Sequence, residues 1–141
     1  MEFNKCTSSS KNKITKIHEN KSELIIKNNN NKTINKIKVD GCLIGDKFEK
    51  CDYIVTTIEN NKPQKAFFIE LKGCKIEKAI NQLDSTLNLT KTYFEDYVKE
   101  CYIICTRVPK SSSKIQKMRI IFSNNHKSTL SIKTTRHTIE C

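Results

Sequence analysis

Long apolar runs are absent from this 141-residue sequence. No segment approaches the roughly 20 consecutive apolar residues that a membrane-spanning helix needs, so we expect no membrane insertion. The opening residues, MEFNKCTSSSKNK, also lack the short apolar core of a secretory signal. The sequence therefore predicts a cytoplasmic protein.

No CxxC pair occurs among the seven cysteines. An odd number of cysteines without that spacing argues against a zinc site and against a disulfide framework, as does a cytoplasmic location. Cys101 and Cys105 lie four residues apart in CYIICT, where a strand would place both on one face among isoleucines. The sequence thus favours reduced thiols in a hydrophobic core.

Several familiar catalytic and nucleotide-binding spacings are missing as well. The segment GCLIGD lacks the GK[ST] ending of a phosphate-binding loop. His18, His126 and His137 show no HxH or HExxH spacing and lie in polar surroundings, which is typical of surface histidines. No pairing of Ser or Cys with His indicates nucleophilic catalysis.

The charge is strongly positive, at +11, and comes almost entirely from lysine, since there are only three arginines. Abundant Lys, Asn and Ile, with NNNN at 28–31, also fit the codon usage of an AT-rich genome. From Arg107 to the end, however, eight basic residues stand against one acid, Glu140. Codon usage does not explain the loss of acids, so this stretch favours a polyanionic partner, whose phosphates attract clustered lysines.

The length fits one domain. Residues 1–12 are polar and rich in Ser and Lys, and we expect them to be disordered, which leaves 13–141 as a single domain. Residues 14–26 suit a short helix, although ELIIK could equally form a strand. Alternation then predicts three strands in a meander, in TINKIKVDGCLI, CDYIVTTIE and AFFIELK.

The apolar period changes from two to 3.6 after Gly73. One helix face over roughly 75–91 is apolar, at Ile76, Ala79, Ile80, Leu83 and Leu87. CYIICTRV predicts a fourth, central strand, and residues 113–122 predict a helix with Ser113 as its N-cap. STLSIKTTRHTI predicts a last strand. The expected order is α-β-β-β-α-β-α-β in an α/β domain.

The segment AFFIELKG ends an apolar strand on two charged residues. Because side chains alternate along a strand, Glu70 and Lys72 share one face at the strand end. Asp52 opens the preceding strand, and a hairpin would bring it to the same end. Two carboxylates and an ammonium would then meet at one rim of the sheet. The simpler alternative is a solvated strand end with a weak surface ion pair.

Such a group suits Mg²⁺, with Mn²⁺ as a substitute, because Mg²⁺ prefers oxygen ligands and is often held by one or two carboxylates. Asp52 and Glu70 would be those ligands, and the backbone carbonyl of Leu71 would be a third. The metal would acidify a bound water and neutralise a phosphate. Lys72 would orient or deprotonate the attacking water.

These residues resemble the PD-(D/E)xK nuclease superfamily: Asp52, then IELK at the end of an apolar strand, then an amphipathic helix. The resemblance implies a restriction-endonuclease-like αβββαβ core, with a mixed central sheet flanked by helices. Asp52, Glu70 and Lys72 would be the motif residues. The implied activity is metal-dependent cleavage of nucleic acid.

Other positions follow from the resemblance alone. Many members carry a Glu on the first helix, for which Glu23 is preferred to Glu19 because it directly precedes LII. Many also carry a Gln on the helix after the motif, where Gln82 would touch substrate or water. The sequence departs from the pattern at Cys51, which replaces the proline before the aspartate. Asp40 is a rival metal ligand.

The leading hypothesis is therefore a metal-dependent nuclease that hydrolyses DNA phosphodiester bonds, with DNA preferred to RNA. The basic C-terminal third would follow the phosphate backbone through Lys110, Lys114, Lys117 and Arg119. A homodimer or a larger complex would supply the recognition surface that so small a domain lacks.

Two alternatives remain open. The first is a catalytically inactive nuclease-fold module that binds nucleic acid or a partner protein, since fold does not fix function. The second is a small structural or interaction protein whose charges only keep it in solution.

Overall fold

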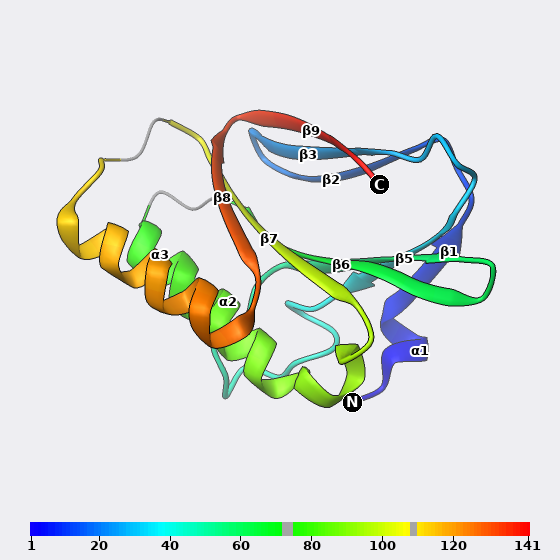
Figure 1. The fold of residues 1–141 in the computed structure, drawn as a ribbon, viewed down its shortest axis with the longest axis horizontal. Coiled ribbons are helices and arrows are strands. Elements are labelled where there is room, and N and C mark those ends of the chain that lie inside the picture. The colour runs from blue at the N-terminus through cyan, green and yellow to red at the C-terminus, as the bar shows by residue number, and fades with distance from the viewer. Residues whose placement is uncertain (72–74, 108–109) are drawn as a thin grey trace.

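The computed structural model describes residues 1–71, 75–107 and 110–141. Within these residues the chain forms three α-helices, one 3-10 helix and nine strands, arranged in two mixed sheets (Figure 1). The α/β class expected from the sequence is therefore confirmed.

The larger sheet has six strands in the order β1-β4-β5-β6-β7-β8. Their bounds are β1 Thr7–Ser10, β4 Thr33–Lys38, β5 Tyr53–Glu59, β6 Lys62–Leu71, β7 Val98–Cys105 and β8 Thr129–Thr134. Strands β4, β5 and β6 form the antiparallel meander that the sequence predicts, and β7 and β8 run parallel to β6.

Helices cover one face of this sheet and lie side by side in Figure 1. Helix α2 (Ile76–Leu89) joins β6 to β7, followed by the 3-10 helix η1 (Lys91–Phe94), and α3 (Ser113–His126) joins β7 to β8. Such crossovers are what parallel neighbouring strands require. No helix of the described segments is long and apolar enough to cross a membrane.

Both helices were predicted from the sequence, and the apolar face of α2 is buried as expected. The N-cap of α3 is Ser112 rather than Ser113, because the Ser112 hydroxyl accepts a hydrogen bond of 3.1 Å from the N–H of Ile115. The N-cap differs by one residue, and the helix ends at His126 rather than at the predicted residue 122.

A three-stranded sheet in the order β2-β3-β9 covers the opposite face of the main sheet (Figure 1). β2 (Ile14–Glu19) and β3 (Ser22–Lys27) form a hairpin, and β9 (Arg136–Glu140) pairs in parallel with β3. The helix predicted over 14–26 is therefore wrong. The αβββαβ order is observed only from its second element onward, and the restriction-endonuclease-like core stays a prediction.

A two-residue turn explains the hairpin. Asn20 has a φ of 52°, a left-handed conformation that Asn tolerates better than most residues and that favours tight hairpin turns. Ile17, Leu24 and Ile26 then point to the main sheet and are buried. The helical prediction counted Ile17 and Leu24 as part of one apolar face but gave no weight to the turn between them.

The last predicted strand divides at Thr135, where φ is 57°. β8 lies in the main sheet and β9 in the small one, so this break carries the chain from one sheet to the other. Along β6, Phe68 packs on the helix side, whereas Phe67 and Ile69 pack against the small sheet. β6 is therefore buried on both faces.

The N-terminal segment is ordered, contrary to the disorder predicted for residues 1–12. It contains α1 (Phe3–Cys6) and β1, which pairs with the outer edge of β4. An open strand edge offers unpaired backbone groups, and these bind a polar segment that has no core of its own. The ring of Phe3 also lies 4.7 Å from that of Tyr93.

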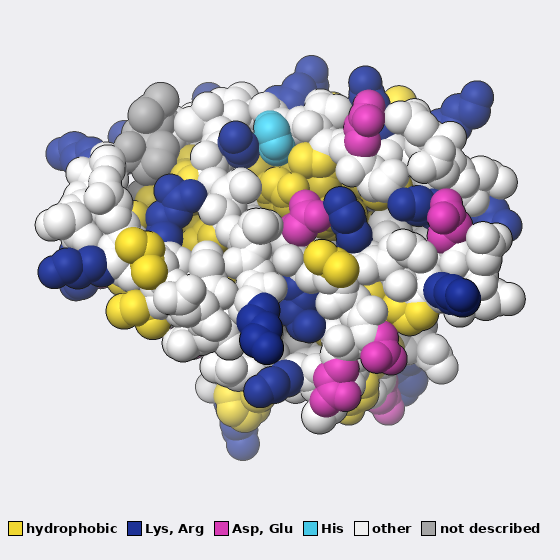
Figure 2. All heavy atoms as spheres, in the orientation of Figure 1, with side chains coloured by type: hydrophobic (Ala, Val, Ile, Leu, Met, Phe, Trp, Pro, Cys, Tyr) yellow, Lys and Arg dark blue, Asp and Glu magenta, His cyan; other side chains and the backbone are white. Residues whose placement is uncertain are grey.

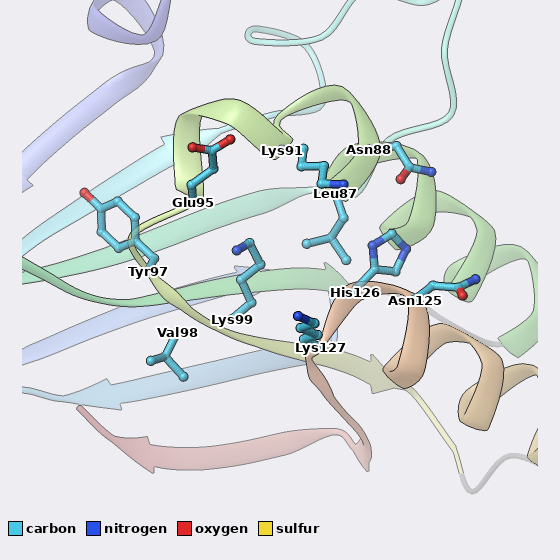
Figure 3. Close-up of a pocket in the computed structure, with 10 residues that line it drawn as sticks. All are labelled: Leu87, Asn88, Lys91, Glu95, Tyr97, Val98, Lys99, Asn125, His126 and Lys127. Carbon is cyan, nitrogen blue, oxygen red and sulfur yellow. The ribbon is translucent and has the colours of Figure 1, made fainter.

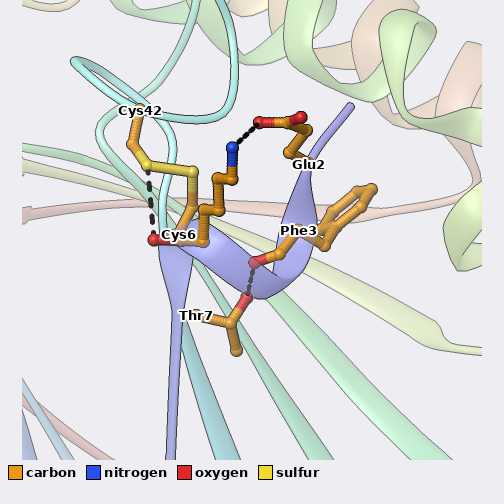
Figure 4. Close-up of a disulfide and its surroundings, with 6 residues drawn as sticks. Glu2, Phe3, Cys6, Thr7 and Cys42 are labelled. Atoms are coloured by element: carbon orange, nitrogen blue, oxygen red, sulfur yellow. Dashed lines mark hydrogen bonds and ion pairs between the residues drawn. A yellow bond between two sulfur atoms is a disulfide. The ribbon is translucent and has the colours of Figure 1, made fainter.

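A disulfide joins Cys6 to Cys42, so the prediction that the cysteines are reduced is wrong for this pair (Figure 4). The two residues are 36 positions apart, with no local spacing to reveal them. The pairing of β1 with β4 brings their Cα atoms to 5.7 Å, within the range of a disulfide. Cys101 and Cys105 are buried thiols outside the disulfide, as predicted.

Candidate active site

Asp52 lies directly before β5, at the end of the sheet where β6 finishes with Glu70 and Leu71. The β5–β6 ladder pairs Tyr53 with Ile69, so the residues before Tyr53 and after Ile69 adjoin. The Asp52 N–H donates to the Ile69 carbonyl at 3.1 Å, and Asp52 Oδ2 accepts from the Leu71 N–H at 2.7 Å. Asp52 therefore contacts the residues on both sides of Glu70.

The backbone around Asp52 is fixed from the other side as well. Its carbonyl accepts hydrogen bonds from the N–H groups of Val39, at 3.0 Å, and Asp40, at 3.3 Å. Asp52 is only 8 % exposed and Glu70 only 7 % exposed. Buried carboxylates are rare unless a site or a partner stabilises them. A solvated strand end, the simpler reading, does not describe these two residues.

The two carboxylates act on a common neighbour, the thiol of Cys51. Burial raises the pKa of this thiol far above its ordinary value, and the negative charges of Glu70 and Asp52 raise it further. Coulomb effects of this kind weaken with distance. Both carboxylates thus lie near Cys51, which packs against the helix side of the sheet.

Helix α2 holds the segment that carries Asp52. The hydroxyl of Thr86 accepts a hydrogen bond of 2.9 Å from the Cys51 N–H and donates one of 2.9 Å to the carbonyl of Gln82. Thr86 therefore contacts the residue before Asp52. Gln82, the predicted glutamine of the site, lies one helical turn before Thr86 on the same helix. Its side chain is half-buried.

A pocket of about 310 Å³ adjoins Asp52. The residues that line it come from three segments: His18, Glu19, Lys38, Asp40, Gly41, Asp52 and Tyr53. Burial raises the pKa of the Tyr53 hydroxyl, and the charges of Glu19 and Asp52 raise it further. The rival ligand Asp40 and the less favoured Glu19 are therefore the acids that share a pocket with Asp52.

The preferred Glu23 lies elsewhere. Its Oε2 accepts a hydrogen bond of 2.8 Å from Arg136 Nε, and it lines a different pocket. The signal that Glu19 lies nearer to Asp52 was the hairpin turn, since Glu19 directly precedes Asn20. That turn directs Glu19 to the pocket that Asp52 lines.

Lys72 lies outside the described residues. Leu71 is the last residue of β6, and the group that contacts Asp52 is its N–H. The metal-binding role proposed for its carbonyl stays a prediction.

The lysines and the arginine predicted to bind nucleic acid differ in their surroundings. Lys110 and Lys117 are exposed. Lys114 pairs with Glu77 at 3.2 Å, and Arg119 donates to the Leu130 carbonyl at 2.8 Å, which ties α3 to β8. Figure 2 shows Lys and Arg side chains spread over one whole face of the molecule, with no single patch.

A magnesium ion at this site would have few protein ligands. In residues 1–71, 75–107 and 110–141, no group of three or more His, Cys, Asp or Glu side chains could hold a metal ion. Mg²⁺ often takes only one or two carboxylates and completes its shell with water and substrate phosphate. Asp52 and Glu70, adjoining and both oxygen donors, match that pattern.

No protein-family model, curated protein or solved structure matches this chain. The case for a function therefore depends on the geometry around Asp52 and Glu70.

Proposed function

We propose that this chain is a metal-dependent nuclease that hydrolyses DNA phosphodiester bonds. The observation that supports the proposal best is the position of Asp52, whose backbone and carboxylate contact the residues on either side of Glu70. Both acids would hold Mg²⁺, or Mn²⁺ in its place, with the Leu71 carbonyl as a further oxygen. When bound, the ion supplies an acidified water and neutralises phosphate charge.

The other residues have roles that follow from their place near this pair. Lys72, two residues after Glu70, would orient the attacking water and offset the negative charge that develops on the phosphate. Gln82 would contact substrate or water. Its place on α2, one turn before the residue bound to Cys51, supports that role.

The substrate proposed is DNA, because the chain carries a net charge of +11 and basic residues follow the site along the chain. Leu71 pairs with Ile104, so β6 and β7 end at the same edge of the sheet. The chain that leaves β7 there carries the exposed Lys110 and Lys117. These lysines would contact backbone phosphates.

The deciding experiment is a cleavage assay on plasmid and single-stranded DNA, with Mg²⁺ and Mn²⁺ titrated separately. Asp52→Asn keeps an oxygen that accepts the Leu71 N–H but removes the charge. We expect this variant, Glu70→Gln and Lys72→Ala each to lose roughly 100-fold or more in rate. Asp96→Asn, which removes an exposed acid outside the site, is the matched control and should cut normally.

Other outcomes identify the alternatives. Salt-sensitive retention on DNA without cleavage in either metal would indicate the inactive binding module. Neither cleavage nor retention would indicate an interaction protein, and cleavage that survives Asp52→Asn would refute the site. Light scattering with and without DNA checks the proposed homodimer or larger complex.

A further inference from the structure

A second pocket, of about 480 Å³, lies where β7 begins (Figure 3). Four elements form it: the end of α2, the segment around η1, the start of β7 and the end of α3. The residues that line it are Leu87, Asn88, Lys91, Glu95, Tyr97, Val98, Lys99, Asn125, His126 and Lys127.

This pocket is distinct from the candidate active site. Val98, at its edge, pairs with Lys65, five residues before Glu70 on β6. Five residues of strand correspond to about 17 Å. The pocket shares no lining residue with the one beside Asp52. It therefore lies apart from the residues proposed for cleavage.

The charge of the pocket is positive. Lys91, Lys99 and Lys127 line it, against a single carboxylate, that of Glu95. In the described part of the chain, no ion pair joins any of these three lysines to an acid. The pocket thus gathers three ammonium groups against one carboxylate.

Lys99 is the most informative of the three. It is half-buried, and Figure 3 shows it extending from β7 into the space between η1 and the end of α3. Burial raises the pKa of the nearby Cys101 thiol, and the positive charge of Lys99 opposes that rise. A bound anion would pair with this half-buried ammonium group through charge-assisted hydrogen bonds.

A histidine and two asparagines also line the wall of this pocket. His126 Nε2 lies 2.6 Å from Asp84 Oδ1, and its ring packs 4.8 Å from that of Phe122, so the imidazole is held in place. Asn88 and Asn125 contribute amide groups. Ammonium and amide donors around one space suit the several oxygens of a phosphate.

We propose that this pocket binds a phosphate group, with Lys99 and Lys127 as its main contacts. The volume lies within the range of small-molecule sites and leaves room for a mononucleotide. The phosphate comes either from a free phosphorylated small molecule or from the backbone of a nucleic acid. The proposal is independent of the nuclease function.

The test is an amide-resolved NMR titration of the full chain at constant ionic strength. The probes are inorganic phosphate, AMP and a short DNA duplex. Lys99→Gln/Lys127→Gln should weaken binding roughly tenfold. Lys47→Gln/Lys62→Gln, which removes two exposed lysines outside the pocket, is the charge-matched control and should bind normally. Each free variant's spectrum shows whether it is folded.

Saturable shifts at the amides of the pocket, lost only in the first double variant, support the proposal. Stronger binding of AMP then identifies a free small molecule, and stronger binding of the duplex identifies a nucleic acid. Absence of saturable shifts there with all three probes, or equal weakening in the control, overturns it. Asp52→Asn should bind phosphate normally, which separates this result from the test of cleavage.

Discussion

Thr86 of helix α2 is hydrogen-bonded to the backbone of Cys51, the residue before Asp52. Its hydroxyl accepts the Cys51 N–H and donates to the Gln82 carbonyl, each at 2.9 Å, and both Thr86 and Cys51 are fully buried. The side chain of Thr86 thus joins helix α2 to the segment that leads into β5. This contact is one of several that hold the segment carrying Asp52.

We predict that Thr86→Val destabilises the protein by about 1–3 kcal/mol. Valine has the same shape but leaves the buried Cys51 N–H without an acceptor. Thr90→Val is the matched control, because the Thr90 hydroxyl only donates to the Thr86 carbonyl, which also accepts the Thr90 N–H. Urea unfolding measures the stability of both variants. Equal losses of stability in the two would contradict a special role for the hydrogen bond between Thr86 and Cys51.

The two candidate glutamates should differ in their effect on cleavage. Glu19→Gln should lower the rate at least about tenfold, because Glu19 lines the pocket beside Asp52 and its charge acts there. Glu23→Gln should leave the rate within about twofold, because Glu23 pairs with Arg136 elsewhere. Cleavage rates of the two variants at saturating metal test this prediction. A larger loss in Glu23→Gln than in Glu19→Gln would favour Glu23, the residue preferred from the sequence.

Removal of the disulfide should destabilise the folded chain by about 2–4 kcal/mol, because the bond closes a long loop between Cys6 and Cys42. Unfolding of the wild type with and without reductant measures this loss. Cys42→Ser should match the reduced wild type and show no further response to reductant. Equal stability of the oxidised and reduced wild type would show that the bond contributes nothing.

The buried thiols should make stability fall in alkali. Burial raises the pKa of Cys101 from 9.0 to about 12, so the folded state keeps a proton that the unfolded chain loses. The stabilisation is complete below pH 9 and declines as the pH rises toward 12. The limiting slope is about 1.4 kcal/mol per pH unit.

Unfolding free energies of the wild type and Cys101→Ala, measured at several pH values above 9, test this. The wild type should lose stability more steeply than the variant. Cys141→Ala, at a half-buried thiol, is the control and should change the slope less. Parallel curves for wild type and Cys101→Ala would show that the Cys101 thiol ionises equally in both states.

Local patterns predicted strands β4 to β8 of the main sheet and helices α2 and α3, but not β1. The apolar face of α2 and the alternation through β4, β5 and β6 depend on residues close together in the chain, so the sequence displays them directly. The hairpin over residues 14–26 was missed, because its apolar spacing also suits a helix. The turn at Asn20 and the packing against Phe67 and Ile69 favour the strands.

The residues of the two candidate sites also differ in whether the sequence could reveal them. Asp52 and Glu70 were found because each lies at the end of a strand in a simple meander, and a hairpin brings such ends together. Glu19 was ranked below Glu23, since its place beside Asp52 depends on how the small sheet packs on the large one. Lys99 and Lys127 lie 28 residues apart and gave no signal.

The sequence by itself determined the class of the fold, the meander with its following helix, and the pair Asp52 and Glu70, because these depend on periodicity and on contacts between successive elements. Only the tertiary structure decided the Cys6–Cys42 disulfide, the small sheet and the Lys99 pocket. Those features join segments far apart in the chain, and their contacts are favourable only after the two sheets and the helices have packed together.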